Sequence, residues 1–218
     1  MPPEAILPVA DRLRLAPVSV VAAMGVEAWA VRRRAPEVPV QQAGIGLRGW
    51  HGSITTPVVA SVGLAGGLRR DLPPGTVVIA TEVALEDAAP TRCDADWVAA
   101  TVAAARSLGL ACVTGPLVTA THLVTGAERE LWAAKGFLAV DMESAHLAGH
   151  ASRLAVVRVL LDTPRHELSP AWARPSRAAL DPRNFRELVW LLRNVPRYSL
   201  RAAAVLAKAI RRDIDAEV

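Results

Sequence analysis

The chain has 218 residues, of which 52% are hydrophobic and 21% are charged, and its formal net charge is +4. This length and apolar content fit one domain with a large buried core and exclude intrinsic disorder as the main state. Two cysteines, Cys93 and Cys112, exclude a secreted disulfide framework or a four-cysteine zinc site, so we expect a reduced, intracellular protein. Glu4 and Asp11 argue against a signal peptide, and no apolar run approaches the roughly 18 residues of a transmembrane helix.

Short apolar runs alternate with helical patterns along most of the chain. Strands are expected at Val18–Ala23, Val58–Val62, Val77–Ala80, Ala111–Thr119, Leu138–Met142 and Leu154–Leu161. Helices are expected at Val26–Arg34, Asp94–Gly109, Gly126–Lys135 and near Ser144–Ser152. The alternation predicts an α/β fold of three α/β/α layers around a mostly parallel or mixed sheet.

Two glycine patterns have different interpretations. The segment 44–49 matches the dinucleotide-binding pattern GxGxxG, which needs a long helix directly after it. Residues 50–57 leave almost no room for that helix, so we interpret the segment as a turn at a strand end and expect no nicotinamide cofactor. The glycines of 63–67 follow a buried strand, where they would let a ligand approach the backbone N–H groups. A simple tight turn is the alternative for this second segment.

A metal site and a serine nucleophile are both weakly indicated. Glu143, His146 and His150 would share one face of a helix, a spacing that can bind a metal. No second cluster of ligands occurs in the sequence, and histidines on alanine-rich helices are more often structural, so we expect no metal. A GxSxG nucleophile elbow is missing as well.

Acidic residues at strand ends carry the most chemical information. Glu27, Glu143 and Asp162 each lie at or just after the end of a buried strand, where α/β folds bind ligands. Burial raises the pKa of a carboxyl group, which can then donate a proton near neutral pH. A helix N-cap would explain one such acid, whereas three acids from separate strands favour a shared site.

Several short segments in chain order form a set that resembles one known family. They are Ala22–Glu27, Gly44–Gly46, Val62–Leu68 with Leu72–Ile79, Val140–Ala145 and Val157–Asp162. Together they resemble the nucleoside phosphorylase and nucleosidase superfamily, which includes methylthioadenosine/S-adenosylhomocysteine nucleosidase. The resemblance implies a nucleoside phosphorylase-like catalytic domain over residues 1–164, with residues 165–218 as a helical C-terminal extension of the same domain.

The resemblance also implies an enzyme that cleaves the N-glycosidic bond of a purine nucleoside. Asp162 would be the general acid that protonates N7 of the purine, and Glu27 would orient or deprotonate the attacking water. Both roles agree with the chemistry, because cleavage builds positive charge on the ribose, which a carboxylate stabilises, and negative charge on the base.

Substrate-binding residues follow from the same resemblance. Glu143 would bind the ribose hydroxyls, with Met142 under the sugar. Gly66 and Gly67 belong to the ribose-side glycine motif. The base would lie against Leu123 and Val124, where Leu123 replaces the usual stacking aromatic residue.

Water is the expected nucleophile, and no cofactor is expected. The arginine-bearing phosphate loop of the phosphorylases is not visible around Met24–Glu27. Without cations a phosphate nucleophile has no evident partner. A purine nucleoside phosphorylase therefore stays an alternative, together with a methylthioadenosine-type nucleosidase and a non-catalytic protein that binds a nucleoside or a membrane.

Within the superfamily, the chain is most similar to the hopanoid-associated subgroup. The similarity lies in the compact body, the glycine motif of Ser61–Leu68 and the long basic C-terminal region. It implies adenosylhopane as the substrate, with ribosylhopane and adenine as the products. The family resemblance also leaves a homodimer open.

Positive charge is concentrated near the C-terminus. Residues 165–212 contain 11 basic and 3 acidic residues, whereas residues 1–164 contain 14 and 15. On a helical wheel, one sector is basic and holds Arg197, Arg201, Lys208 and Arg212. The opposite sector is apolar and holds Leu200, Ala203, Leu206, Ala207 and Ile210. In the preceding segment, Trp190 falls among Arg186 and Arg193. This pattern suits an anionic membrane surface and equally a helix docked on the domain. We expect a cytoplasmic enzyme, peripheral at the inner membrane surface, without a nucleic-acid partner.

Overall fold

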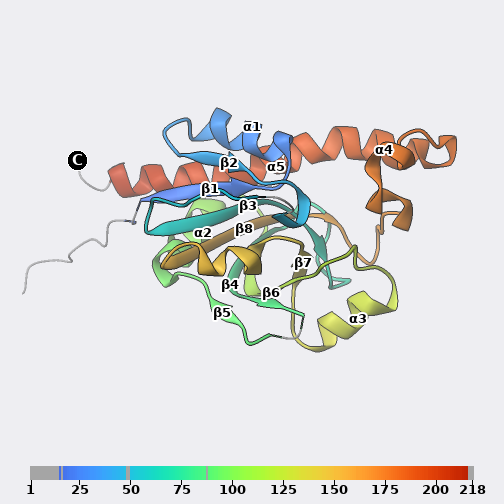
Figure 1. Ribbon diagram of the computed structural model, residues 1–218, viewed down its shortest axis with the longest axis horizontal. Helices are drawn as coiled ribbons and strands as arrows, with labels where there is room; N and C mark the ends of the chain where they lie inside the picture. Colours follow the sequence, from blue (N-terminus) through green and yellow to red (C-terminus); the bar gives the residue numbers. More distant parts are fainter. Residues whose placement is uncertain (1–14, 16, 48–49, 87, 216–218) are drawn as a thin grey trace, which may run out of the picture.

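The computed structural model describes residues 15, 17–47, 50–86 and 88–215 (Figure 1). The strands are β1 (Val18–Ala22), β2 (Val40–Gln42), β3 (Val58–Gly67), β4 (Val77–Leu85), β5 (Thr91–Arg92), β6 (Cys112–Thr119), β7 (Ala139–Asp141) and β8 (Arg153–Asp162). The α-helices are α1 (Gly25–Arg34), α2 (Ala95–Ser107), α3 (Ala127–Ala134), α4 (Pro175–Ala178) and α5 (Phe185–Asp215). The 3₁₀ turns are η1 (Ile45–Leu47), η2 (Ser144–Gly149), η3 (Pro170–Ala173) and η4 (Pro182–Asn184).

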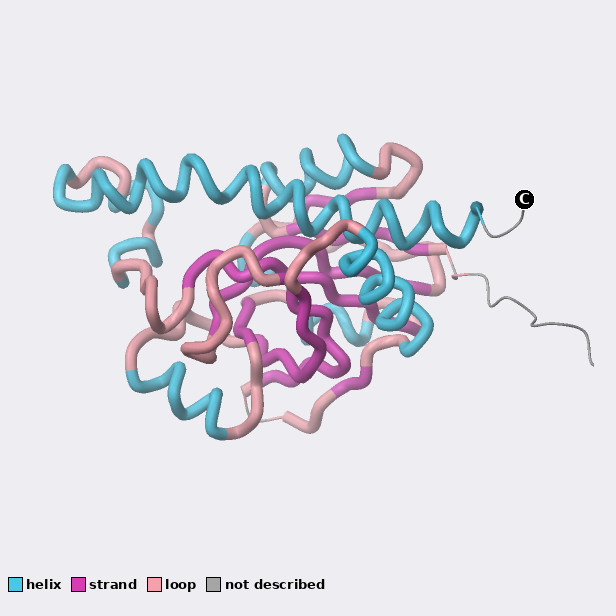
Figure 2. The backbone as a smooth tube through the Cα atoms, turned by 180° about the vertical axis from the view of Figure 1, so that it is seen from behind, coloured by secondary structure: helices cyan, strands magenta, loops and turns pink. Residues whose placement is uncertain are grey.

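The strands form one mixed sheet that curls until it meets itself. β3 pairs with β8, β8 with β4, β4 with β6, β6 with β7, and β7 returns to β3 (Figure 2). β1 and β2 extend this ring from β3, and β5 extends it from β4. The α/β fold with a mixed sheet and a helical C-terminal extension is thus confirmed, and the expected strands are present, while the short strands β2 and β5 were not predicted.

Both faces of the sheet are covered, which explains why its strands read as continuous apolar runs. β1 is buried along its whole length, as is almost all of β3 and β8. Helices α1, α2 and α5 pack together over one face, and η2 contributes to the core on the other (Figure 1). The carboxyl ends of β1, β7 and β8 bring their following residues toward one cavity.

The second half of α5 docks on the sheet. Ala203 and Leu206 are fully buried, and Leu200 and Ile210 pack against the same core. The apolar row that was a candidate for membrane contact is therefore the docked side of the helix. Trp190 also faces the domain, with its ring centroid 4.5 Å from that of His166, so the prediction that it lies among the outward arginines is wrong. No helix in the described ranges is both long and apolar enough to cross a bilayer.

The predicted α-helix near Ser144–Ser152 is wrong, because the chain forms the 3₁₀ turn η2 there. Side chains cap the first N–H groups of this turn, but the turn ends at Gly149 and β8 already begins at Arg153, which leaves no room for a longer helix. Asp141 accepts from the N–H of Ser144 at 3.2 Å, and the Thr119 hydroxyl accepts from that of Ala145 at 2.9 Å. The helical face proposed for Glu143, His146 and His150 therefore does not exist.

Candidate functional site

A cavity of about 190 Å³ lies at the carboxyl ends of the strands. Seven of the eight residues singled out from the sequence line it: Glu27, Gly66, Leu123, Val124, Met142, Glu143 and Asp162. The eighth, Gly67, lies outside the lining, and its carbonyl accepts a hydrogen bond from the guanidinium of Arg129 at 2.7 Å. Residues from five separate parts of the sequence thus meet in one cavity, as the strand-end argument predicts.

Glu27 is held in the first turn of α1, directly after β1. Its two carboxylate oxygens accept hydrogen bonds from the backbone N–H of Met24 at 2.9 Å and of Leu64 at 2.8 Å. A Cβ at Gly63 would collide with the carboxylate, so this glycine makes room for Glu27 under β3. Burial raises the pKa of Glu27, although the charge of Arg158 and both backbone hydrogen bonds oppose the rise. The pKa of Glu27 therefore lies above that of a free glutamate.

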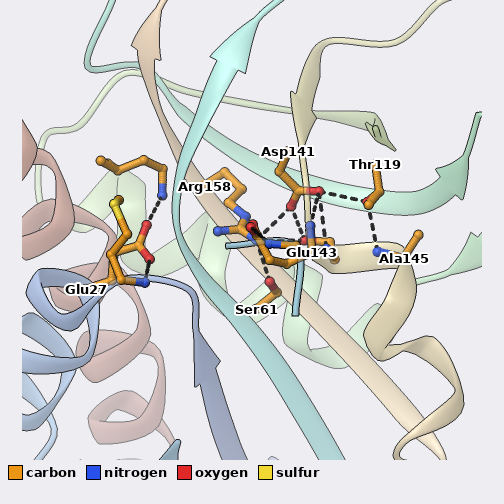
Figure 3. Close-up of polar contacts among 11 residues, drawn as sticks. Glu27, Ser61, Thr119, Asp141, Glu143, Ala145 and Arg158 are labelled. Atoms are coloured by element: carbon orange, nitrogen blue, oxygen red, sulfur yellow. Dashed lines mark hydrogen bonds and ion pairs between the residues drawn. The ribbon is translucent and has the colours of Figure 1, made fainter. Parts of the chain in front are cut away.

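Arg158 is a central residue of the site that the sequence analysis missed. It projects from β8, is 1% exposed, and lies 2.7 Å from Asp141 and 3.3 Å from Glu143 (Figure 3). The hydroxyl of Ser61 accepts a further hydrogen bond from it at 2.6 Å. One guanidinium thus faces the carboxyls of Asp141, Glu143 and Glu27. Burial outweighs this one cation at Glu27 and Glu143, whose carboxyls retain protons to higher pH than free ones.

Glu143 reaches the cavity from the turn between β7 and η2. Its Oε1 accepts a hydrogen bond from the N–H of Gly46 at 2.9 Å. Gly44 and Gly46 have φ of 82° and 68°, a conformation that glycine adopts readily. The described part of the GxGxxG segment, residues 44–47, is therefore a turn, as predicted, and its backbone positions Glu143. Burial raises the pKa of Glu143 despite the nearby charge of Arg158.

Asp162, at the end of β8, forms a buried ion pair with Arg129. Arg129 projects from α3 and also lies 3.0 Å from Glu167, whose carboxylate accepts from the N–H of Gly126 at 2.7 Å. Burial raises the pKa of Asp162, and the Arg129 guanidinium opposes that rise. Sequence reasoning missed Arg129, because a basic residue in a helical pattern is normally an exposed one.

The carboxyl groups of Glu27 and Asp162 approach β3 at positions that are two residues apart. Glu27 binds the N–H of Leu64, and a Cβ at Gly66 would lie 3.2 Å from Oδ1 of Asp162. Both carboxyls therefore approach the same stretch of β3, which also lines the cavity.

A second group of titratable side chains lies at the cavity mouth. Glu86, His122 and Glu128 place ligand atoms within 4.8 Å of one another, a donor set that suits a divalent cation. Nε2 of His122 lies 3.0 Å from the Glu128 carboxylate, which raises the pKa of the imidazole. An ion pair between a protonated His122 and Glu128 accounts for this geometry without a metal.

Comparison with known proteins places the chain in a family. The sequence profile of the phosphorylase superfamily matches residues 53–166, while a search of curated protein sequences gives no match. Among solved structures, the chain is similar to the 5'-methylthioadenosine/S-adenosylhomocysteine nucleosidase of Neisseria meningitidis in complex with methylthio-immucillin-A. The TM-score is 0.68 and the sequence identity is 19%, and the match covers 91% of this chain and 100% of that one. The futalosine hydrolase of Helicobacter pylori is similar with a TM-score of 0.67 and 13% identity over 89% and 97% of the two chains. The profile spans more than half of the sequence, and the chain therefore belongs to the phosphorylase superfamily.

Proposed function

We propose that this protein hydrolyses the N-glycosidic bond of a purine nucleoside. The observation that carries the proposal is the placement of Glu27 and Asp162 on one cavity, at β3 positions two residues apart. Burial raises the pKa of each. In the proposed reaction, Glu27 removes a proton from water and Asp162 donates a proton to the base.

The reaction follows from these positions. The bond between C1' of the ribose and N9 of the purine breaks, and its electron pair stays with the base, which takes a proton at N7 from Asp162. Water forms the new bond to C1' and gives its proton to Glu27. Glu143 would accept hydrogen bonds from the ribose hydroxyls, and its charge would stabilise the cationic sugar of the transition state. Met142 and Gly66 would border the sugar, and Leu123 and Val124 the base.

Water is the nucleophile that this site favours over phosphate. Glu27 and Glu143 line the sugar side of the cavity, with Asp141 beside them. Arg158 is already paired with Asp141 and Glu143, and Arg129 is paired with Asp162 and Glu167. An incoming phosphate would thus meet carboxylates, and the arginines that could bind it are already paired. Placing the phosphate anion there would require more free energy than placing a neutral water molecule.

Adenine is the proposed base, and an apolar group, as in adenosylhopane, is the proposed 5' substituent. In support, the cavity walls include Ile45, Leu161 and Leu168, and Ile45 is 46% exposed at the edge. The lipid part of such a substrate would extend out through the mouth of the cavity. Residues 165–218 would extend the catalytic domain of 1–164 toward the inner surface of the membrane that holds such a lipid.

Chromatography of free purine tests this function. Adenosine, inosine, methylthioadenosine and an adenosine with a long 5' alkyl group are each incubated with the protein in phosphate-free buffer. We expect free adenine from the adenosine compounds and the highest kcat/KM for the alkyl compound. Higher kcat/KM for methylthioadenosine would favour the soluble type of nucleosidase, and free hypoxanthine from inosine as the main product would refute adenine as the base.

Phosphate is expected not to enter the sugar product. Phosphorus-31 NMR of a reaction in phosphate buffer should show inorganic phosphate alone, because the sugar side of the cavity has no unpaired cation among its described residues. A ribose-1-phosphate signal that requires both enzyme and phosphate would establish phosphorolysis instead.

Substitution of Arg129 by Gln should move the alkaline limb of the activity profile. Asp162 acts in its protonated form, so activity falls as pH rises through its pKa. Removing the cation removes the two largest effects that lower the pKa of Asp162, and leaves only the backbone hydrogen bond from Leu168 to oppose burial and Glu167. The alkaline limb of kcat/KM should therefore shift by about one pH unit or more to higher pH, since a lost neighbouring cation typically moves a carboxyl pKa by 1–3 units.

The matched control is Arg129→Lys, which keeps the positive charge and should restore most of the wild-type profile. An unchanged alkaline limb in Arg129→Gln, with the protein folded, would show that Asp162 does not titrate in the rate-limiting proton transfer.

A further inference from the structure

Exposed apolar side chains gather on one part of the molecule outside the cavity. Four of the eight large hydrophobic residues that are exposed in the described part of the chain fall within residues 180–192. They are Leu180 at 84% exposed, Phe185 at 64%, Val189 at 48% and Leu192 at 67%. These residues, with the exposed Arg183, Arg186, Arg193 and Arg197 beside them, form what we call the α5 patch.

Helical spacing explains the arrangement of the α5 patch. Phe185, Val189 and Leu192 lie at i, i+4 and i+7 and make one apolar row. Arg186, Arg193 and Arg197 make a second row beside it, offset by about 100° around the helix. Figure 1 shows this first half of α5 reaching beyond the sheet together with α4. The α5 patch therefore covers nothing in the described part of the protein.

The opposite face of the same helical segment is engaged with the domain. The carboxylate of Glu187 accepts hydrogen bonds from the N–H of Ser169 at 3.1 Å and from the indole of Trp172 at 2.5 Å. Trp190 packs on His166. Leu168, between these contacts, lines the cavity. One short segment, 166–172, thus joins the cavity wall to the helix that bears the α5 patch.

We propose that the α5 patch docks the protein on an anionic lipid bilayer, with the apolar row in the interface and the arginine row on the lipid headgroups. The inference rests on the proposed function, because a lipid-linked nucleoside would reach the cavity from such a surface. Apolar side chains flanked by Lys or Arg on a helix are the usual composition of an interfacial helix. A contact of this kind is weak and salt-sensitive, because the headgroup attraction acts within a Debye length.

Charge favours a lipid surface over a second copy of this chain. A two-fold symmetric contact would place the α5 patch against itself, so four arginines would face four arginines. Asp181 is the acid beside them, and its carboxylate already accepts from the N–H of Arg183. Anionic headgroups would satisfy the arginine row without this repulsion.

Vesicle co-sedimentation tests the inference on the full chain. The wild type is compared with two variants of the α5 patch, Phe185→Ser/Leu192→Ser and Arg186→Gln/Arg193→Gln. The control variant is Arg106→Gln/Leu108→Ser, which alters an exposed arginine and an exposed leucine at the end of α2. Vesicles of phosphatidylcholine with and without phosphatidylglycerol are used at low and high salt. We expect the wild type and the control to pellet with anionic vesicles at low salt, and the partition coefficient of both α5 patch variants to fall about tenfold or more.

The cleavage of adenosine, a soluble substrate, is measured in parallel for all four proteins and should be equal. Equal pelleting of the wild type and the α5 patch variants, or no pelleting of any protein, would overturn the inference. Sedimentation velocity that shows a dimer for the wild type and monomers for the α5 patch variants, without vesicle binding, would assign the face to self-association. Vesicle binding without any nucleoside cleavage would refute the proposed function and leave the docking surface standing.

Discussion

Asp162→Asn is expected to lower kcat for a purine nucleoside by about 100-fold or more, the usual loss when a proton-transfer group is removed. The amide has nearly the shape of the carboxyl but cannot protonate N7, so the base would have to leave as an anion. Arg129 keeps a carboxylate neighbour, because Glu167 lies 3.0 Å away, and the fold should survive. Steady-state kinetics with adenosine measure the effect, and circular dichroism checks the fold.

The control for this substitution is a ribose with a 4-nitrophenolate leaving group. This group departs without a proton, so Asp162→Asn should hydrolyse it at close to the wild-type rate. Near-wild-type turnover of the nucleoside by the variant would refute the role of Asp162 as the acid. An equal loss on both substrates would show that Asp162 acts on the sugar or on binding.

Glu27→Gln is expected to reduce kcat by a similar factor of about 100 or more, and on both substrates alike. Glutamine can still accept the hydrogen bond from the N–H of Leu64, but it cannot take a proton from water. The loss should be independent of the leaving group, because the nucleophile is the same in both reactions. Glu27→Gln and Asp162→Asn thus differ on the nitrophenyl substrate, which separates the base from the acid.

A Glu27→Gln variant that keeps near-wild-type rates would remove the general base from the account. Thermal unfolding of the variant is the check on structure, because Glu27 is fully buried and its carboxylate bonds two backbone groups. A folded variant with lost activity on both substrates is the expected result.

The sequence predicts the positions of the buried strands because both faces of the sheet are covered. β1, β3 and β8 appear as apolar runs for this reason, and their carboxyl ends locate Glu27 and Asp162. The exception within β8 is Arg158, a lone arginine inside the run Leu154–Leu161. That break in the apolar pattern is the signal that could have identified it, since a buried arginine must meet carboxylates.

Other features depend on contacts between distant segments and could not be predicted locally. The Asp162–Arg129 pair joins residues 33 positions apart, and the bond from Gly46 to Glu143 spans 97. The start of η2 is likewise fixed from another strand, because the Thr119 hydroxyl accepts a hydrogen bond from the N–H of Ala145. The amphipathic pattern of α5 could not show which half docks. The structure buries the row around Leu206 and leaves the row of Phe185 exposed.

The most direct test of the account measures free purine released from adenosine in phosphate-free buffer by the wild type and by Glu27→Gln/Asp162→Asn. The account predicts that the wild type releases one purine for each free ribose, and that the double variant, folded by circular dichroism, releases neither above the uncatalysed rate. Purine release by the double variant at the wild-type rate, or a wild type that cleaves no purine nucleoside with or without phosphate, would contradict the claim that this cavity breaks an N-glycosidic bond.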